Sequence, residues 1–387
     1  MSRYLLGLHA GCSEPGVHSA LVKVHESASS PGPRFILGMF QPFPLELCKW
    51  LSKVGDRNPG DTQFFGEACR LIISQFVVAA YATIREAGLK PELITAIGCD
   101  TALGSLEESR RMRALAGWGP GMDISKGTGI SVVALQTGCL QGREQNSDPV
   151  FCDISRKVSK PCIHIHLGGT VRLFAEIPGH KPFYANRGPC GSLFEVLYSS
   201  KKHLLNGAEN FSKMAVQGAC EETLLGKWKQ SSARFSARKN RDDFAKNVLE
   251  DICRSLRPEQ DAANILCTGH HFVVSNITEA LADLRKAGMS GPCFLSGPQA
   301  KNGFLRHLMA LAMPNMEWLT SDGLGIPSVS FDAYARALAA SMALAKGSHD
   351  RFSASDSNFP SAAFYPGNSE SWASCLRWMN GDSRKIA

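Results

Sequence analysis

The sequence predicts an α/β protein of two related lobes. Each half of the chain begins with short apolar strands joined by Gly- and Pro-rich turns, then alternates helices with strands. Its 387 residues suffice for two separate cores, and 44% hydrophobic with 20% charged residues is typical of soluble globular proteins. We expect an N-terminal lobe over residues 1–158, a C-terminal lobe over 159–347 and a loosely held Ser-, Pro- and Gly-rich tail over 348–387.

In the first lobe, Gly and Pro mark the turns and apolar spacing marks the elements. Gly accepts positive φ and Pro fixes φ, so the cluster at 11–16 predicts a turn between the first two strands. Apolar residues at helical spacing predict one long helix over 62–87, which Gly88 ends. The other elements expected here are strands at 4–8, 19–24, 35–39, 94–98 and 130–135, and a short helix at 44–54.

The second lobe begins with the same kind of elements. Apolar runs at 171–176 and 183–185 flank Pro178 and Gly179, which predicts a hairpin. A helix is expected near Ser192, whose hydroxyl suits an N-cap. The other elements expected here are strands at 161–167, 263–268, 292–296 and 316–318, and helices at 241–254, 274–287, 302–312 and 331–344.

Cysteine use and charge restrict the classes of function. The 13 cysteines form no CxxC pair and no zinc-ligand spacing, which favours reduced thiols and a cytoplasmic protein. No apolar run approaches the roughly 20 residues of a membrane helix, so no membrane partner is expected. The formal net charge of +7 suits small anionic ligands such as nucleotides. Basic residues between Lys227 and Arg241 lack aromatic platforms, so no nucleic-acid partner is expected.

Six short motifs, in order along the chain, resemble the anhydro-N-acetylmuramic acid kinase family. Residues 7–22 resemble the family's GLMSGTSLDGVDAALV, and residues 321–327 resemble TDELGIP. One Gly motif alone would be weak support, whereas six in register indicate the family. In the other four, residues 87–98 resemble AGLSPEDIDAIG, residues 166–169 resemble NLGG, residues 186–189 stand where the family has DTGP, and residues 295–302 resemble CGGGARN.

This resemblance implies a fold, a reaction and its ligands. The fold would be a two-lobed actin-like ATPase, a duplicated ribonuclease-H-like unit with a central cleft for ATP. The reaction would open the ring of 1,6-anhydro-N-acetylmuramic acid and phosphorylate its O6, using ATP and Mg²⁺, in peptidoglycan recycling and amino sugar metabolism. The implied partners are a nucleotide and a small sugar, and a homodimer stays open.

Glycine-rich turns are the implied ATP-binding elements. Such turns present backbone N–H groups to phosphate oxygens without a Cβ in the way. The resemblance places a second phosphate hairpin at Gly168, Gly169 and Thr170, and adenosine contacts at Gly297 and Asn302. The alternative, that these glycines only serve tight turns, stays open. The first-loop positions are Gly11, Cys12, Ser13, Glu14, Pro15, Gly16, Val17 and His18.

The catalytic positions depart from the family pattern. Ring opening needs a carboxylate that takes a proton from the attacking water, and the family uses the Asp of DTGP. Asn186 stands at that position, and an amide cannot accept a proton usefully near neutral pH. Pro15 and His18 replace the two aspartates of the first loop, which puts Mg²⁺ binding in doubt.

Two further motifs are altered, and one of them offers a substitute base. The family's SHGQT becomes CDTAL at 99–103, and its ADFR becomes ALQT at 134–137. Asp100 follows a strand and could act as a displaced base; a capping or solvent-exposed Asp is the alternative that we favour. We therefore expect a kinase-like protein with weak or altered catalysis, or a pseudokinase that binds nucleotide or sugar and acts through a partner. Whether the chain is an enzyme stays open.

One histidine pair resembles a metal site. His164 and His166 alternate along one expected strand with Cys162, so the three share a face. A metal would need a further ligand such as His270 or His271. We favour partly buried strand histidines and assign no metal ligand.

Overall fold

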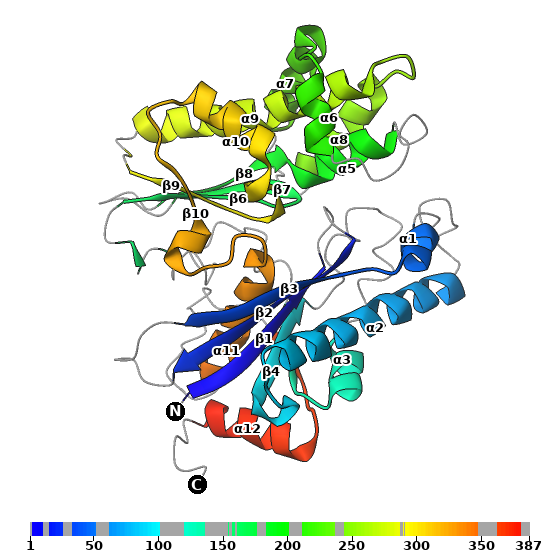
Figure 1. Ribbon diagram of the computed structural model, residues 1–387, viewed down its shortest axis with the longest axis vertical. Coiled ribbons are helices and arrows are strands. Elements are labelled where there is room, and N and C mark those ends of the chain that lie inside the picture. Colours follow the sequence, from blue (N-terminus) through cyan, green and yellow to red (C-terminus); the bar gives the residue numbers. More distant parts are fainter. Residues whose placement is uncertain are drawn as a thin grey trace. The chain divides into compact units, whose positions relative to one another are not determined.

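The chain forms two compact units, each built on one mixed sheet (Figure 1). One unit comprises Met1–Lys157 with Leu324–Ala387, and the other comprises Val158–Gly323. The α/β class is confirmed. The computed structural model describes residues 2–10, 15–25, 33–51, 62–100, 120–135, 154, 157–158, 161–175, 183–200, 211–236, 244–286, 289, 291–346 and 362–380.

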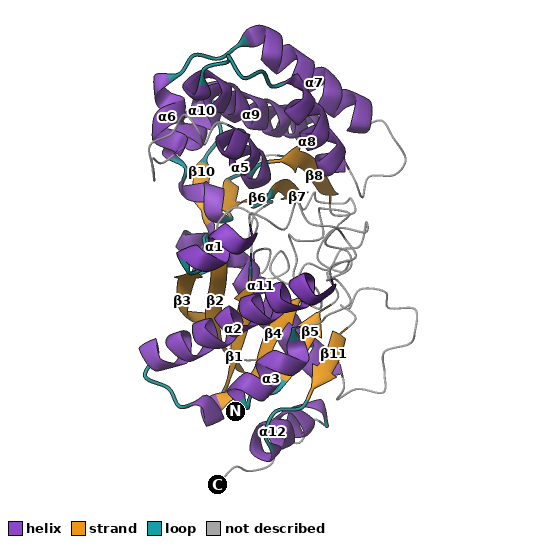
Figure 2. Ribbon diagram, turned by 90° about the vertical axis from the view of Figure 1, so that its right-hand side faces the viewer, coloured by secondary structure: helices purple, strands orange, loops and turns teal. Residues whose placement is uncertain are grey.

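The sheet of the first unit has six strands in the order β11-β5-β4-β1-β2-β3. Strands β1, β2 and β3 form an antiparallel meander, β4 and β5 run parallel to β1, and β11 adds an antiparallel edge strand (Figure 2). The strands are β1 (Ser2–His9), β2 (Gly16–His25), β3 (Arg34–Pro42), β4 (Ile94–Asp100), β5 (Val132–Leu135) and β11 (Ala362–Tyr365).

Two helices cover opposite faces of this sheet. The apolar side of α2 packs on Leu6 and Leu8 of β1, whereas α11 lies against Gly7 on the other face. By length and composition α2 could also cross a membrane, but half of that stretch is buried in the unit. The helices are α1 (Leu45–Leu51), α2 (Thr62–Glu86), the 3₁₀ turn η2 (Pro91–Leu93), α3 (Gly121–Thr128), α11 (Phe331–Lys346) and α12 (Ser369–Met379).

The second unit repeats the strand scheme in the order β10-β9-β6-β7-β8. Three antiparallel strands are again followed by two that run parallel to the first, so the duplicated topology is confirmed. Its strands are β6 (Ile163–Leu167), β7 (Thr170–Ala175), β8 (Phe183–Pro189), β9 (Cys293–Ser296) and β10 (Trp318–Thr320).

Helices form most of the second unit and pack around one apolar core. The longest is α9, whose buried residues recur along its whole length. The helices are α5 (Gly191–Ser200), α6 (Phe211–Gln217), α7 (Glu222–Ser236), α8 (Phe244–Ser255), α9 (Ala262–Lys286), α10 (Gly303–Ala312) and the 3₁₀ turns η7 (Pro298–Lys301) and η8 (Ser321–Leu324).

The strand expected at 263–268 is wrong, because those residues begin helix α9. The backbone N–H of Asn264 donates to the Asp261 carboxylate at 2.9 Å, which caps the helix start. A short apolar run fits a buried strand or a buried helix equally well, and the cap decides for helix. The expected helix over 274–287 is therefore the second half of one 25-residue helix.

The expected limits of the second lobe and of the tail are also wrong. Helix α11 lies within the expected lobe 159–347 but packs on β1, β2 and β4 of the first unit. The expected tail 348–387 contains β11 and α12, which belong to that same unit. Helix α11 covers one face of the first sheet, and β11 pairs with its strand β5.

Candidate functional site

The carboxyl ends of β1 and β4 bring His9 and Asp100 together in the first unit. These strands are parallel neighbours, so their last residues meet at one edge of the sheet. Gly7 and Gly98 precede them, and a Cβ on either would run into the backbone of α11, at Ala333 and at Arg336. Two glycines thus let α11 approach closely and set Arg336 beside Asp100.

Asp100 is the centre of a buried charged network. Its two carboxylate oxygens accept from Arg336 Nε at 3.2 and 3.1 Å, and His9 Nδ1 lies 3.1 Å from Oδ2. Arg336 Nη1 also donates to Asp332 Oδ1 at 3.2 Å, one turn earlier on α11. The side chains of Asp100 and Arg336 are 6% exposed, and those of His9 and Asp332 are 15% exposed. The favoured capping or solvent-exposed role for Asp100 is therefore wrong.

The network fixes the charges of its members. Burial alone would raise the pKa of Asp100, but the Arg336 charge and the His9 hydrogen bond outweigh it and hold that pKa below its ordinary value. Burial, together with the Arg336 charge, lowers the pKa of His9. At neutral pH an anionic Asp100 accepts from the Nδ1–H of a neutral His9. A carboxylate held in this way is a weak proton acceptor.

The first-loop residues fall partly on β2. Gly11, Cys12, Ser13 and Glu14 lie outside the described residues. Pro15 immediately precedes β2, and Gly16, Val17 and His18 are its first residues. Val17 is buried in the apolar core. His18 is buried as well, with its ring centre 4.6 Å from that of Phe40. His18 is the register partner of His9.

The second glycine hairpin joins β6 to β7 and holds the start of α5. The Gly169 carbonyl accepts from Cys190 N at 2.8 Å and from the Ser192 hydroxyl at 2.7 Å, and the Gly168 carbonyl accepts from Gly191 N at 2.9 Å. Thr170 begins β7. The Ser192 hydroxyl is a donor to the hairpin, so its expected N-cap role is wrong. These contacts give the hairpin a structural role of its own.

Gly297 and Asn302, the expected adenosine contacts, both have structural roles. Gly297 has φ +90°, and a Cβ there would lie 2.5 Å from the Leu167 carbonyl oxygen. Asn302 caps α10 by accepting from Leu305 N at 3.1 Å, while its NH₂ group lies 3.0 Å from His270 Nε2 and 3.2 Å from Gln299 Oε1. Both the oxygen and the NH₂ group of Asn302 are thus engaged within the unit.

Asn186 lies on β8 and is exposed. Its side-chain oxygen accepts from Gly188 N at 3.0 Å, which supports the turn at Gly188, where φ is +100°. Asn186 pairs in register with Arg172 of β7. The amide therefore holds a local turn and carries no titratable group.

The histidine pair of β6 is fully buried, more than the partly buried state that we favoured. His166 Nδ1 lies 3.0 Å from the Ser296 hydroxyl, and burial holds the pKa of His164 well below its ordinary value. Within the described ranges, no group of three His, Cys, Asp or Glu side chains could hold a metal. Asp100 and Asp332 are already committed to Arg336. This donor set does not fit Mg²⁺.

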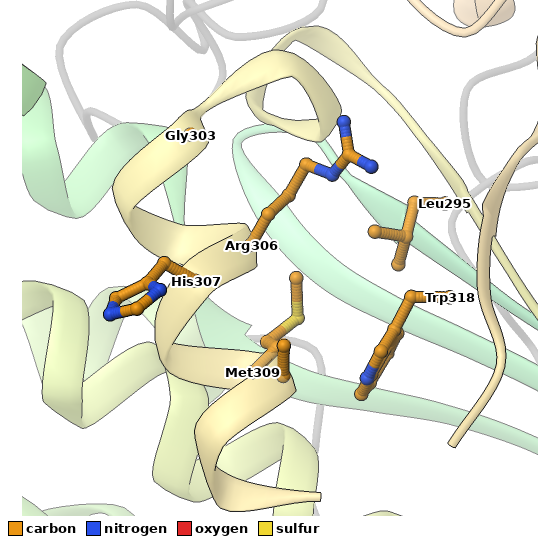
Figure 3. A pocket seen from close by; sticks show the side chains of 7 residues that line it. Leu295, Gly303, Arg306, His307, Met309 and Trp318 are labelled. Atoms are coloured by element: carbon orange, nitrogen blue, oxygen red, sulfur yellow. The ribbon is translucent and has the colours of Figure 1, made fainter. Parts of the chain in front are cut away.

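A cavity of about 300 Å³ lies between α10 and strands β9 and β10 (Figure 3). Sequence patterns gave no sign of it, since its residues come from three elements. In Figure 3 Leu295 and Trp318 lie to the right of Met309 and the Arg306 side chain lies above it, while His307 lies on the other side of α10. Its lining consists of Leu295, Gly303, Arg306, His307, Met309, Ala310 and Trp318.

Known proteins similar to this chain include kinases. The family model described as anhydro-N-acetylmuramic acid kinase matches residues 3–351. Anhydro-N-acetylmuramic acid kinase of Rippkaea orientalis (strain PCC 8801 / RF-1) is 22% identical over 345 residues, 84% of this chain and 88% of that protein. The kinase of that name from Shewanella denitrificans (strain OS217 / ATCC BAA-1090 / DSM 15013) is 22% identical over 338 residues. The match covers 84% of this chain and 87% of that protein. A solved structure, component A of (R)-2-hydroxyglutaryl-CoA dehydratase from Acidaminococcus fermentans, has a TM-score of 0.40 at 12% identity, covering 86% of this chain and 98% of its own.

Proposed function

Because the chain belongs to the anhydro-N-acetylmuramic acid kinase family, we propose that it binds ATP and an anhydro amino sugar and transfers phosphoryl groups weakly or to an altered substrate. The observation that carries this proposal is Asn186. It stands where the family resemblance puts the proton-accepting carboxylate, and its amide oxygen is used on the Gly188 N–H. Loss of one general base typically lowers a rate by ~10²–10⁴.

The bound nucleotide would supply the phosphoryl group, and the chain's own residues would hold and orient the sugar. Phosphoryl transfer depends mainly on positioning and on stabilising charge, so a site without its base can keep slow turnover. Pro15 at a former aspartate position and the engagement of Asp100 with Arg336 both support weak catalysis.

The change Asn186→Asp tests this proposal. An aspartate can still accept from Gly188 N, so the turn is kept while a titratable carboxylate is restored. We expect transfer from radiolabelled ATP to 1,6-anhydro-N-acetylmuramic acid to rise about 10²-fold in kcat. Asn186→Ala restores no carboxylate and is the matched control. Its kcat should not rise. Equal rates in the original chain and Asn186→Asp would contradict a role for this position.

The pseudokinase is the second candidate. It is favoured by the donor set, since the described carboxylates nearest to β1 and β4 neutralise Arg336 and are unsuited to Mg²⁺. A pseudokinase should release a heat of ATP binding in titration calorimetry, and that heat should be similar with and without Mg²⁺. It should transfer no phosphoryl group to any sugar. Transfer that depends on Mg²⁺ would exclude it.

A further inference from the structure

We propose that His9 is the proton acceptor of this chain and that Asp100 is its positioning residue, an inference that rests on the proposed function. The pair lies on adjacent parallel strands, with Nδ1 of His9 3.1 Å from Asp100 Oδ2. Sequence motifs did not indicate His9, because its partner follows it by 91 residues. A histidine with one nitrogen held by a carboxylate is a common arrangement for a general base.

The hydrogen bond selects the tautomer of His9. Asp100 is ionised and can only accept, so the proton of a neutral His9 resides on Nδ1. That assignment leaves the lone pair on Nε2. The His9 side chain keeps 15% of its surface exposed, so the ring is not sealed within the unit. Nε2 is therefore the atom that can take a proton from a water molecule.

Three elements that pack on β1 contribute titratable or charged groups near His9. Asp100 comes from β4, Arg336 and Asp332 come from α11, and His18 is its register partner on β2. Arg336 holds Asp100 through both oxygens, so the carboxylate cannot rotate away from His9. Burial and the Arg336 charge lower the pKa of His9, which keeps Nε2 unprotonated at neutral pH. The network therefore keeps the ring oriented and ready to accept.

The proposed step balances with water as co-reactant. The water oxygen bonds to C1 of the anhydro sugar while one water proton passes to His9 Nε2, and the C1–O6 bond breaks. O6 takes the γ-phosphoryl group of ATP, and ADP leaves. The imidazolium formed at His9 lies against the Asp100 carboxylate, which stabilises its charge. Release of that proton to solvent resets the ring.

The test compares His9→Gln, Asp100→Asn and the control His307→Gln, an exposed histidine of α10. Transfer from ATP to 1,6-anhydro-N-acetylmuramic acid is followed from pH 5 to 9, with the fold checked by circular dichroism.

In the original chain, kcat should fall as the pH drops through the folded pKa of His9, which lies below 6.5. His9→Gln should lower kcat about 10²-fold and remove that acidic limb, with the KM for ATP unchanged. Asp100→Asn should lower kcat too, because an amide can donate to Nδ1 and move the ring proton to Nε2. His307→Gln should leave kcat and its pH dependence unchanged.

Other outcomes separate this inference from the proposed function. Unchanged kcat and pH profile in His9→Gln would overturn the role of His9 and leave the kinase assignment intact. So would an original chain without measurable transfer that Asn186→Asp activates, since His9 as acceptor should give the original chain slow turnover of its own, which the restored carboxylate only raises. In the double variant Asn186→Asp with His9→Gln, the restored carboxylate should bypass the loss. No transfer in any variant, with no heat on adding ATP or sugar, would reject the proposed function itself.

Discussion

At the residue scale, the Asp100–Arg336 pair is a candidate for function, and the stability of the fold depends on it. Both side chains are buried, so each charge needs its partner. Removal of one member of such a pair leaves the other charge desolvated, which typically costs about 3–5 kcal/mol. Sequence spacing did not predict this pairing, because the two residues are 236 positions apart.

We predict that Arg336→Met destabilises the folded chain by about 3–5 kcal/mol at pH 7 in urea unfolding. The pKa of Asp100 is depressed in the folded state, so the stability from its pairing is present above the ordinary value of 3.8 and is lost as the pH falls through the folded pKa. The difference between variant and original chain should therefore shrink from pH 7 toward pH 3. As a control, Arg254→Met removes surface pairs with Glu250 and Asp251 and should change stability by less than about 0.5 kcal/mol. A pH-independent loss in Arg336→Met would contradict the charge argument.

At the element scale, the approach of α11 to the sheet decides the site. Gly7 and Gly98 lie on adjacent strands, and the α11 backbone passes directly over both. These positions match Gly residues in the family motifs, and the sequence alone placed them within or at the end of expected strands. The structure gives them a packing reason: no side chain fits between sheet and helix.

We predict that Gly98→Ala destabilises the first unit by more than 2 kcal/mol, because the new methyl group meets the backbone of α11 at Arg336. Gly66→Ala is the control, since a Cβ at that α2 position meets nothing within 4 Å. It should stabilise by about 0.5–1 kcal/mol, as expected for Gly to Ala inside a helix. Thermal unfolding of both variants checks the opposite signs, and equal shifts would refute the close approach of α11.

At the scale of the whole molecule, the C-terminal segment completes the first unit. β11 pairs with β5, and α12 is fastened by Arg3, which donates to the Ser374 carbonyl at 2.9 Å and lies 5.1 Å above the Trp378 ring. Ser131 N also donates to the Ser371 hydroxyl at 2.8 Å. Because β11 occupies the edge of the sheet, it protects β5 from pairing with other chains.

We predict that Trp378→Ala lowers the stability of the first unit by about 3 kcal/mol, because it removes a buried ring and the Arg3 contact. Leu376→Ala on the same helix is the control; its side chain is 40% exposed, and its loss should cost less than about 1 kcal/mol. Hydrogen exchange should rise at β5 and β11 in Trp378→Ala and stay unchanged at β6 and β7 of the other unit. Faster exchange across both units would contradict this assignment of α12.

Much of the fold followed from local patterns. The long helix α2, its end at Gly88 and all the strands of both meanders were predicted, because periodicity and turn residues act over a few positions. The error at 263–268 arose where a short apolar run was ambiguous and the Asp261 cap was overlooked. The expected tail was misjudged because its Ser- and Pro-rich composition masked α12.

The sequence by itself determined the family, the α/β class and the amide at the position where the family resemblance puts a catalytic carboxylate, since each is written in short motifs or single residues. Only the tertiary structure decided that Asp100 is ion-paired, that His9 is its partner and that the last helix fastens the first unit. Those contacts join residues 91 to 371 positions apart. Partners so distant along the chain are selected by burial, close packing and charge, which no local pattern contains.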